Sequence, residues 1–191
     1  MNSLSTWRTK TWFTVVAPSY FGNVEIGLTP ASSDEKLIGR LIETSLYDLT
    51  GDFSLAHVKL YFRIKDVKGS KALTTFKGHD FARDYLRSLV RRGSSRIGGI
   101  FQVTTKDGYT LMVTDIAFSV GRARTSQKKI VRDIMKNVTA RKAKELNFEG
   151  FVQEAVLGKI GSEIYNEAKR TLPLRKCEIV KTRLMKEPAA A

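Results

Sequence analysis

The sequence predicts an α+β protein built on an antiparallel β-sheet, with its strands first and its helices after them. Two observations support this class. Before about residue 120, apolar and polar residues alternate in short runs bounded by glycine and proline; after Gly121, apolar residues recur every three or four positions. With 191 residues and 42% apolar content, the chain is long enough to bury a core.

Two strands are predicted near the beginning of the chain. Residues 11–16 (TWFTVV) are rich in β-branched and aromatic side chains, which fit a pleated sheet. Residues 24–28 predict a second strand that ends at Pro30, because proline lacks the N–H that a ladder needs.

The stretch from residue 37 to residue 49 is ambiguous. Its leucines and isoleucines fit helical spacing, while Gly39 and the pair Thr44 and Ser45 weaken a helix. The pattern alone leaves both helix and strand open.

The clearest alternation begins at Val58 and ends at Gly69. Even-numbered positions to 64 are apolar, and the opposite face carries Lys59, Tyr61, Arg63 and Lys65. A half-buried strand is therefore predicted here. A shorter strand is expected at 73–76, and residues 80–92 predict a helix that ends at Gly93.

A β-hairpin is predicted from residues 97–105 and 109–118. The dipeptide Asp107-Gly108 between them accepts the positive φ angles of a two-residue turn.

Helices follow the hairpin. Residues 126–146 place Ile130, Ile134 and Val138 on one stripe, which predicts a long amphipathic helix. A second helical stretch over 149–170 is interrupted at Gly158 and Gly161 and stopped by Pro173. Residues 175–185 predict a returning strand.

The predicted organisation is a basic arm over residues 1–10, a single RNA-binding domain over 11–186 and a frayed tail over 187–191. The domain is expected to be β-rich to about residue 120 and helical over 126–170.

The charge balance points to an acidic partner. The chain has 33 Lys and Arg against 19 Asp and Glu, a net charge of +14 that opposes compaction until a polyanion neutralises it. Residues 96–191 hold 19 of the basic side chains and 10 of the acidic ones, so the second half should carry more of the contact surface.

Several function classes are poorly supported. One cysteine, Cys177, cannot form an internal disulfide, and two histidines are too few for most catalytic metal sites. We expect no metal, no cofactor, no small-molecule substrate and no membrane span or leader, and hence a cytoplasmic protein. Residues 158–162 (GKIGS) have the letters of a phosphate loop but not its order.

The basic residues instead form rows typical of RNA binding. Arg83, Arg87 and Arg91 recur every four positions, and the loop RRGSSRIGG that follows combines guanidinium groups, hydroxyls and glycines that suit phosphate. An alternative is a solvated helix face partly paired with Asp80 and Asp84.

A second series of basic residues lies before and along the first part of the long helix, where the helix dipole also favours phosphate. Three cations near the C-terminus of that helix complement its dipole, so they are not included in the predicted RNA-binding site: Arg141, Lys142 and Lys144. In the last strand, cations either follow an RNA backbone or protect a sheet edge. In the arm, aromatic and basic residues interleave, as in proteins that stack unpaired bases. The predicted RNA-binding residues are Arg8, Lys10, Arg83, Arg87, Arg91, Arg92, Ser94, Ser95, Arg96, Arg122, Arg124, Lys128, Lys129, Arg132, Lys136, Arg175, Lys176, Lys181 and Arg183.

The chain resembles one family over nearly its whole length: the small-subunit ribosomal proteins of archaea and eukaryotes called eukaryotic-type S-one, formerly S-three-A. The resemblance rests on W-x-x-K-x-W-F (7–13), AP-S-Y-F-G (17–22), IGRLIETSLYDLTGD (38–52), GHDFARDYLRSLVRRGSSRI (78–97), TTKDGY (104–109) and PLRKCEIVK (173–181). The lack of long basic extensions is similar to the archaeal members.

The resemblance implies a structural, ribosome-bound protein on the platform of the small subunit, near the 3′ end of the ribosomal RNA and the messenger exit. Its partners would be ribosomal RNA, neighbouring ribosomal proteins and, near the exit, messenger RNA. It also implies that the antiparallel sheet curls into a partly closed barrel, with a short helix before the central hairpin and two or more C-terminal helices packed on it, and a strand at 37–47. The alternatives are a free-standing RNA chaperone or translation regulator, and an RNA-processing enzyme, for which no catalytic cluster is seen.

Overall fold

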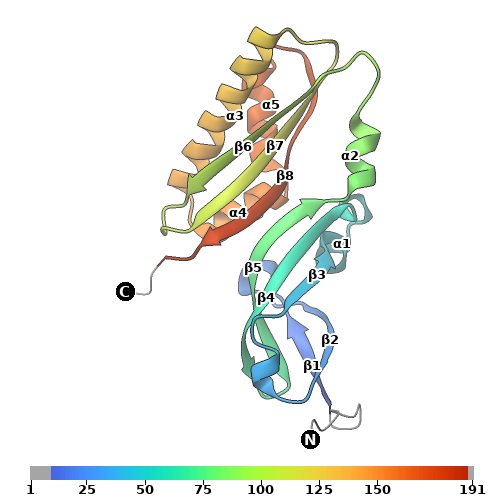
Figure 1. Ribbon diagram of the computed structural model, residues 1–191, viewed down its shortest axis with the longest axis vertical. Coiled ribbons are helices and arrows are strands. Elements are labelled where there is room, and N and C mark those ends of the chain that lie inside the picture. Colours follow the sequence, from blue (N-terminus) through green and yellow to red (C-terminus); the bar gives the residue numbers. More distant parts are fainter. Residues whose placement is uncertain (1–9, 189–191) are drawn as a thin grey trace, which may run out of the picture. The chain divides into compact units, whose positions relative to one another are not determined.

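The computed structural model describes residues 10–188 and confirms the α+β class (Figure 1). The chain divides into two compact units between Gly78 and His79, and each is described by itself. The single domain expected over 11–186 stays a prediction, because a division into compact units does not decide whether the units fold together.

The first unit is built on five strands in the order β2-β1-β5-β4-β3. These are β1 (Thr11–Val16), β2 (Glu25–Ala31), β3 (Leu41–Ser45), β4 (Val58–Lys68) and β5 (Lys71–Phe81). Strands β1 and β5 run parallel, which departs from the antiparallel sheet that we expected. Short helices connect the strands: the 3-10 turns Ser19–Phe21, Asp34–Lys36 and Phe53–Leu55, and α1 (Leu46–Thr50).

Strand β2 extends beyond its predicted end at Pro30. The proline lies within the strand, opposite Trp12 of β1. Because β2 is the last strand on its side of the sheet, the missing N–H of Pro30 breaks no ladder with a further strand.

The ambiguous stretch resolves into a strand followed by a helix. Residues 41–45 pair with β4, which confirms a strand here that is shorter than the 37–47 implied by the family resemblance. Ser45 then caps α1: its Oγ accepts from the Asp48 N–H at 3.2 Å, and the Asp48 carboxylate accepts from the Ser45 N–H at 3.0 Å. In the sequence, Ser45 argued against a helix that runs through this stretch. In the structure, its hydroxyl caps the helix that starts at the next residue.

The alternation along β4 is confirmed. Its even-numbered side chains from Val58 to Ile64 are buried, and Ile64 belongs to a core cluster that includes Phe13 and Ala72. Arg40, at the start of β3, donates to the hydroxyl of Thr29 and the carbonyl of Pro30 in β2, both at 3.0 Å. The sheet therefore curls toward itself without closing, so the term barrel applies to it only loosely.

The second unit is a sheet covered by helices. The end of β5 is followed in the sheet by β8 (Leu174–Lys186), β7 (Thr110–Ser119) and β6 (Arg96–Thr104). Helices α3 (Thr125–Glu145), α4 (Phe148–Val156) and α5 (Lys159–Ala168) pack on it (Figure 1). The two or more helices expected after the hairpin are confirmed.

The helix predicted over 80–92 is shorter, because β5 continues to Phe81. Buried His79 pins the end of that strand to β8 through its Nδ1, 2.8 Å from the Thr182 hydroxyl, and its Nε2, 3.1 Å from the Ile179 carbonyl. Helix α2 then spans Arg83–Leu89 and precedes the central hairpin, as expected.

The hairpin is confirmed, but its turn is not the two-residue type. Thr105 pairs with Tyr109, which leaves three residues in the loop, and only Gly108 of these has a positive φ, of 81°. Asp107 serves the next helix instead, because its carboxylate accepts from the Phe148 N–H at 2.9 Å and thereby caps α4.

The long helix is confirmed; its buried stripe keeps Val138 of the prediction and otherwise follows Val131 and Met135, the neighbours of Ile130 and Ile134. Val131, Met135 and Val138 are buried, whereas Ile130 is 46% exposed. The second helical stretch breaks at 157–158 as predicted. Gly161, however, lies inside α5, where an added Cβ would come 2.6 Å from the Cys177 carbonyl oxygen. Glycine is needed there for close packing on β8.

Within residues 10–188, no helix is both long enough and apolar enough to cross a membrane.

Candidate nucleic-acid interface

Two buried serines join the loop before β6 to the segment after β7. The Ser95 N–H donates to the Ser119 hydroxyl at 2.8 Å, and the Ala123 N–H donates to the Ser95 hydroxyl at 3.1 Å. We call these contacts the serine junction. Residues 91–96 and 122–124 are therefore held at the same end of the sheet, although 26 or more residues separate them in sequence.

The start of β8 lies at this end as well. Ser119 pairs with Leu174, and the Val120 N–H donates to the Pro173 carbonyl at 3.0 Å. Three segments thus bring six arginines together, which we call the arginine corner: Arg91, Arg92, Arg96, Arg122, Arg124 and Arg175.

The arginine corner is exposed and electrostatically unbalanced. Five of its side chains are exposed and Arg175 is partly so. Among residues 10–188, none of the six has a carboxylate within 4.0 Å. Helix α3 begins here with no acidic residue in its first turn, so its positive dipole end adds to the same field. The site suits a polyanion and has no internal counter-charge.

The rest of the two predicted rows extends from this corner. Arg83 and Arg87 are exposed on α2, and neither pairs with the aspartates of the alternative interpretation: among the described residues, Asp80 pairs with Lys181 instead, at 2.5 Å. On α3, three cations are exposed and one is partly so: Lys129, Arg132 and Lys136, and Lys128. The Arg132 Nε donates to the Gly98 carbonyl of β6 at 3.0 Å, which holds the guanidinium beside the sheet.

The two predicted serines are already used by the fold. The Ser94 hydroxyl donates to the Arg91 carbonyl at 2.6 Å, and buried Ser95 is part of the serine junction. Their contacts with RNA stay a prediction, and the structure gives them a different role: they shape the loop that presents the arginines.

The cations of the last strand differ in their surroundings. Lys176 binds Glu178 at 2.7 Å and also contacts the Tyr85 hydroxyl, while Lys181 binds Asp80. Arg183 is exposed. Strand β8 has β7 on one side and the end of β5 on the other, so it is not an edge strand along its whole length. Of the arm, Lys10 is partly buried and Arg8 lies outside the described residues.

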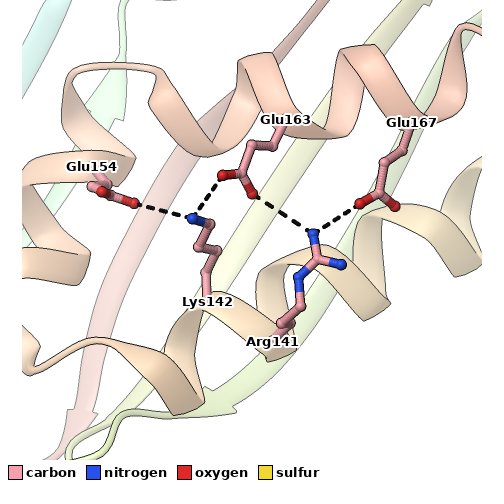
Figure 2. Close-up of polar contacts among 5 residues, drawn as sticks. All are labelled: Arg141, Lys142, Glu154, Glu163 and Glu167. Carbon is pink, nitrogen blue, oxygen red and sulfur yellow. Dashed lines mark hydrogen bonds and ion pairs between the residues drawn. The ribbon is translucent and has the colours of Figure 1, made fainter.

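Two of the three cations that we left out of the site, Arg141 and Lys142, are neutralised within the protein (Figure 2). Lys142 lies 2.6 Å from Glu163, and Arg141 lies 2.8 Å from Glu167, so both tie α3 to α5. The hydrogen bond with Glu163 raises the pKa of Lys142. Lys144 is exposed, and among residues 10–188 no carboxylate lies within 4.0 Å of it.

Arg170 is an exposed cation that the sequence analysis did not single out. Arg170 lies with Ile134 and Asn166 around a shallow hollow between α3 and the end of α5. Its position could not be read from spacing, because the antiparallel packing of two helices places it there.

No catalytic arrangement accompanies these cations. Burial lowers the pKa of His79 to about 4, and burial raises the pKa of the Cys177 thiol, so neither group is ionised for acid–base or nucleophilic work near pH 7. Among residues 10–188, no three metal-ligating side chains gather into a site.

Comparison with known proteins gives consistent matches. The Ribosomal S3Ae family matches residues 2–188. The small ribosomal subunit protein eS1 of Desulfurococcus amylolyticus is 52% identical over 183 residues, which are 96% of this chain and 86% of that protein. The eS1 protein of Sulfurisphaera tokodaii is 51% identical over 183 residues, covering 96% and 95% of the two chains. The eS1 protein of Saccharolobus solfataricus is 48% identical over 182 residues, covering 95% and 88%.

Proposed function

The chain belongs to the Ribosomal S3Ae family, and from that premise we infer how it serves the small ribosomal subunit. It is a structural constituent of that subunit, bound to the ribosome in the cytoplasm, and not an enzyme. We propose that the arginine corner and the exposed cations of α2 and α3 bind ribosomal RNA.

One observation supports this site above all. Three separate segments at one end of a sheet carry six arginines, and no carboxylate of residues 10–188 neutralises them. Arginine forks can hold phosphate in bidentate geometry, and the serine junction fixes the backbone that presents them. The contacts are to phosphate, so they position RNA without reading its sequence.

The finer placement follows from the family resemblance. We propose that the RNA is the small-subunit ribosomal RNA near its 3′ end, on the platform beside the messenger exit. Neighbouring ribosomal proteins, and messenger RNA leaving the subunit, would complete the surroundings.

The test replaces the four unpaired arginines Arg91, Arg92, Arg122 and Arg124 by glutamine in the full chain. Binding to small-subunit ribosomal RNA is then measured from about 50 to about 400 mM salt. We expect weaker binding, and a slope of log affinity against log salt that is shallower by about 0.7–0.9 for each lost phosphate contact. An unchanged slope would move the site elsewhere.

A second measurement separates this role from that of a free-standing RNA chaperone. A ribosomal constituent should sediment with small subunits in high-salt gradients, whereas a chaperone should remain at the top of the gradient.

A further inference from the structure

Strand β4 of the first unit carries a basic and aromatic surface that the arginine corner does not include. Its odd-numbered side chains face away from the core, because the even-numbered ones are buried. Along this face, Tyr61 lies between Lys59 and Arg63, and Lys65 follows. Side chains two apart on a strand lie about 7 Å from each other on the same face.

Strand β5 continues the same surface. The Thr75 hydroxyl donates to the Arg63 carbonyl at 3.4 Å, which places these two residues side by side. Because β5 runs back along β4, the residue two positions after Thr75 on the same face, Lys77, comes near the residue two positions before Arg63, which is Tyr61. A tyrosine ring thus has cations on the same strand and on the next one.

These side chains have no partners within the described protein. Among residues 10–188, no hydrogen bond, ion pair or ring contact involves the side chains of Tyr61, Arg63, Lys65 or Lys77. The other described tyrosines differ: Tyr109, for example, stacks on Phe148 with ring centroids 4.4 Å apart.

The one acidic residue that faces Tyr61 is already neutralised. Glu43 of β3 is the partner of Tyr61 in the strand register, but its carboxylate lies 2.7 Å from the Lys59 ammonium. The positive charge of Arg63, Lys65 and Lys77 is therefore left for an outside anion.

We propose that this β4 face binds single-stranded RNA, with an unpaired base stacked on Tyr61 and the adjoining phosphates held by Arg63, Lys65 and Lys77. A sheet that presents an aromatic ring among cations matches the way in which proteins bind unpaired bases. The proposal rests on the proposed function, and it adds a second contact with a different preference: unpaired nucleotides here, phosphates of any RNA at the arginine corner.

The test compares Tyr61→Ala with Tyr61→Phe in the full chain. The probes are an oligouridylate of about 12 nucleotides and a blunt RNA duplex of the same length. We expect Tyr61→Ala to weaken binding of the single strand by about 5-fold to 100-fold, from the usual contribution of one stacked base. Tyr61→Phe keeps a ring and should retain most of the affinity, and duplex binding should change little for either variant.

The charges on the strand are tested with a matched pair. Arg63→Gln should weaken binding of the oligouridylate, whereas Lys59→Gln, which removes a cation already paired with Glu43, should weaken it less. Thermal unfolding of each variant checks that the sheet is intact.

The outcomes distinguish this inference from the proposed function. If Tyr61→Ala and Arg63→Gln bind the single strand like the unaltered protein, while the arginine-corner variant loses ribosomal RNA, the β4 face is not an RNA site and the proposed function stands. The β4 face is likewise not an RNA site if an acidic peptide, and not RNA, binds in a Tyr61-dependent way. If the unaltered chain fails to bind ribosomal RNA, the proposed function itself is overturned.

Discussion

Helix α3 carries cations along its whole length, but its two halves place them in different surroundings. In the second half, Arg141 and Lys142 reach glutamates of α4 and α5 and bind those helices to α3 (Figure 2). In the first half, cations such as Lys128 and Lys129 have no carboxylate within 4.0 Å among residues 10–188. The same residue types thus serve assembly of the fold at one end and remain available to a polyanion at the other.

This difference teaches how charge should be counted in a basic protein. A net charge of +14 says that an acidic partner is needed but not where it binds. The location follows from subtracting the cations that the fold neutralises for itself. On α3, that subtraction removes Arg141 and Lys142 and leaves the exposed cations nearer the arginine corner, together with Lys144.

The largest expected effect on stability comes from a buried carboxyl against the inner side of α3, away from both sets of surface cations. Buried Asp115 accepts a hydrogen bond from Thr139 of α3 at 2.9 Å, and its other oxygen has no partner among the described residues. Burial raises the pKa of this carboxyl from 3.8 to about 7. The stability that its protonated form provides is therefore complete below about pH 4 and is lost as pH rises through 7.

Asp115→Asn should remove this pH dependence. Between about pH 4 and pH 8, the unfolding free energy of the unaltered chain should fall relative to that of the variant by on the order of 4 kcal/mol, at about 1.4 kcal/mol per pKa unit. Urea unfolding across that range measures it, with Asp133→Asn on the exposed side of α3 as control. Parallel pH profiles for the two proteins would show that the carboxyl is not perturbed.

The comparison itself is sharpened by exchanging matched pairs of cations for glutamine. Arg122 and Arg124 changed together should weaken ribosomal RNA binding by about tenfold to a hundredfold at low salt, because two charge-assisted contacts are lost. Changing Arg141 and Lys142 together should leave that affinity nearly unaltered, because ion pairs with glutamates already neutralise these two cations. Filter binding measures both, and equal losses from the two pairs would remove the distinction between the halves.

A substitution at the close contact between α5 and β8 should disturb the packing of α5, the helix whose glutamates pair with the second half of α3. Gly161→Ala places a Cβ 2.6 Å from the Cys177 carbonyl oxygen, which should push α5 from β8 and cost about 1–3 kcal/mol of unfolding free energy. Gly150→Ala in α4 meets nothing closer than 3.8 Å and should be neutral or stabilising. Chemical denaturation compares the two, and a neutral Gly161→Ala would mean that the helix can shift without loss.

The smallest expected effect concerns a single ion pair. Lys142→Gln should lower the unfolding free energy by up to about 1 kcal/mol, because the ammonium between Glu154 and Glu163 is only partly exposed. Lys128→Gln, on the first half of the same helix, should change it little. The gap should narrow in about 1 M salt, where exposed charges are screened; a gap that persists there would point to packing of the lysine stem.

Much of the secondary structure followed from local pattern. The alternation from Val58, the hairpin around Gly108 and the long helix after Gly121 were predictable, because side-chain periodicity and turn chemistry act within a few residues. The same approach misplaced what depends on distant partners. It ended β5 too early, since His79 and Asp80 look like the start of a helix until β8 supplies their hydrogen bonds.

The features of the candidate site also divide into those that the sequence determines and those that depend on the tertiary structure. The sequence by itself determined that the protein is basic, that its arginines form rows and which family it resembles, because composition and spacing are properties of the chain. Only the tertiary structure decided which cations are free. Ion pairs such as Lys142 with Glu163, and the serine junction that joins two segments of the arginine corner, depend on residues 21 or more positions apart. No local pattern records which of them will meet.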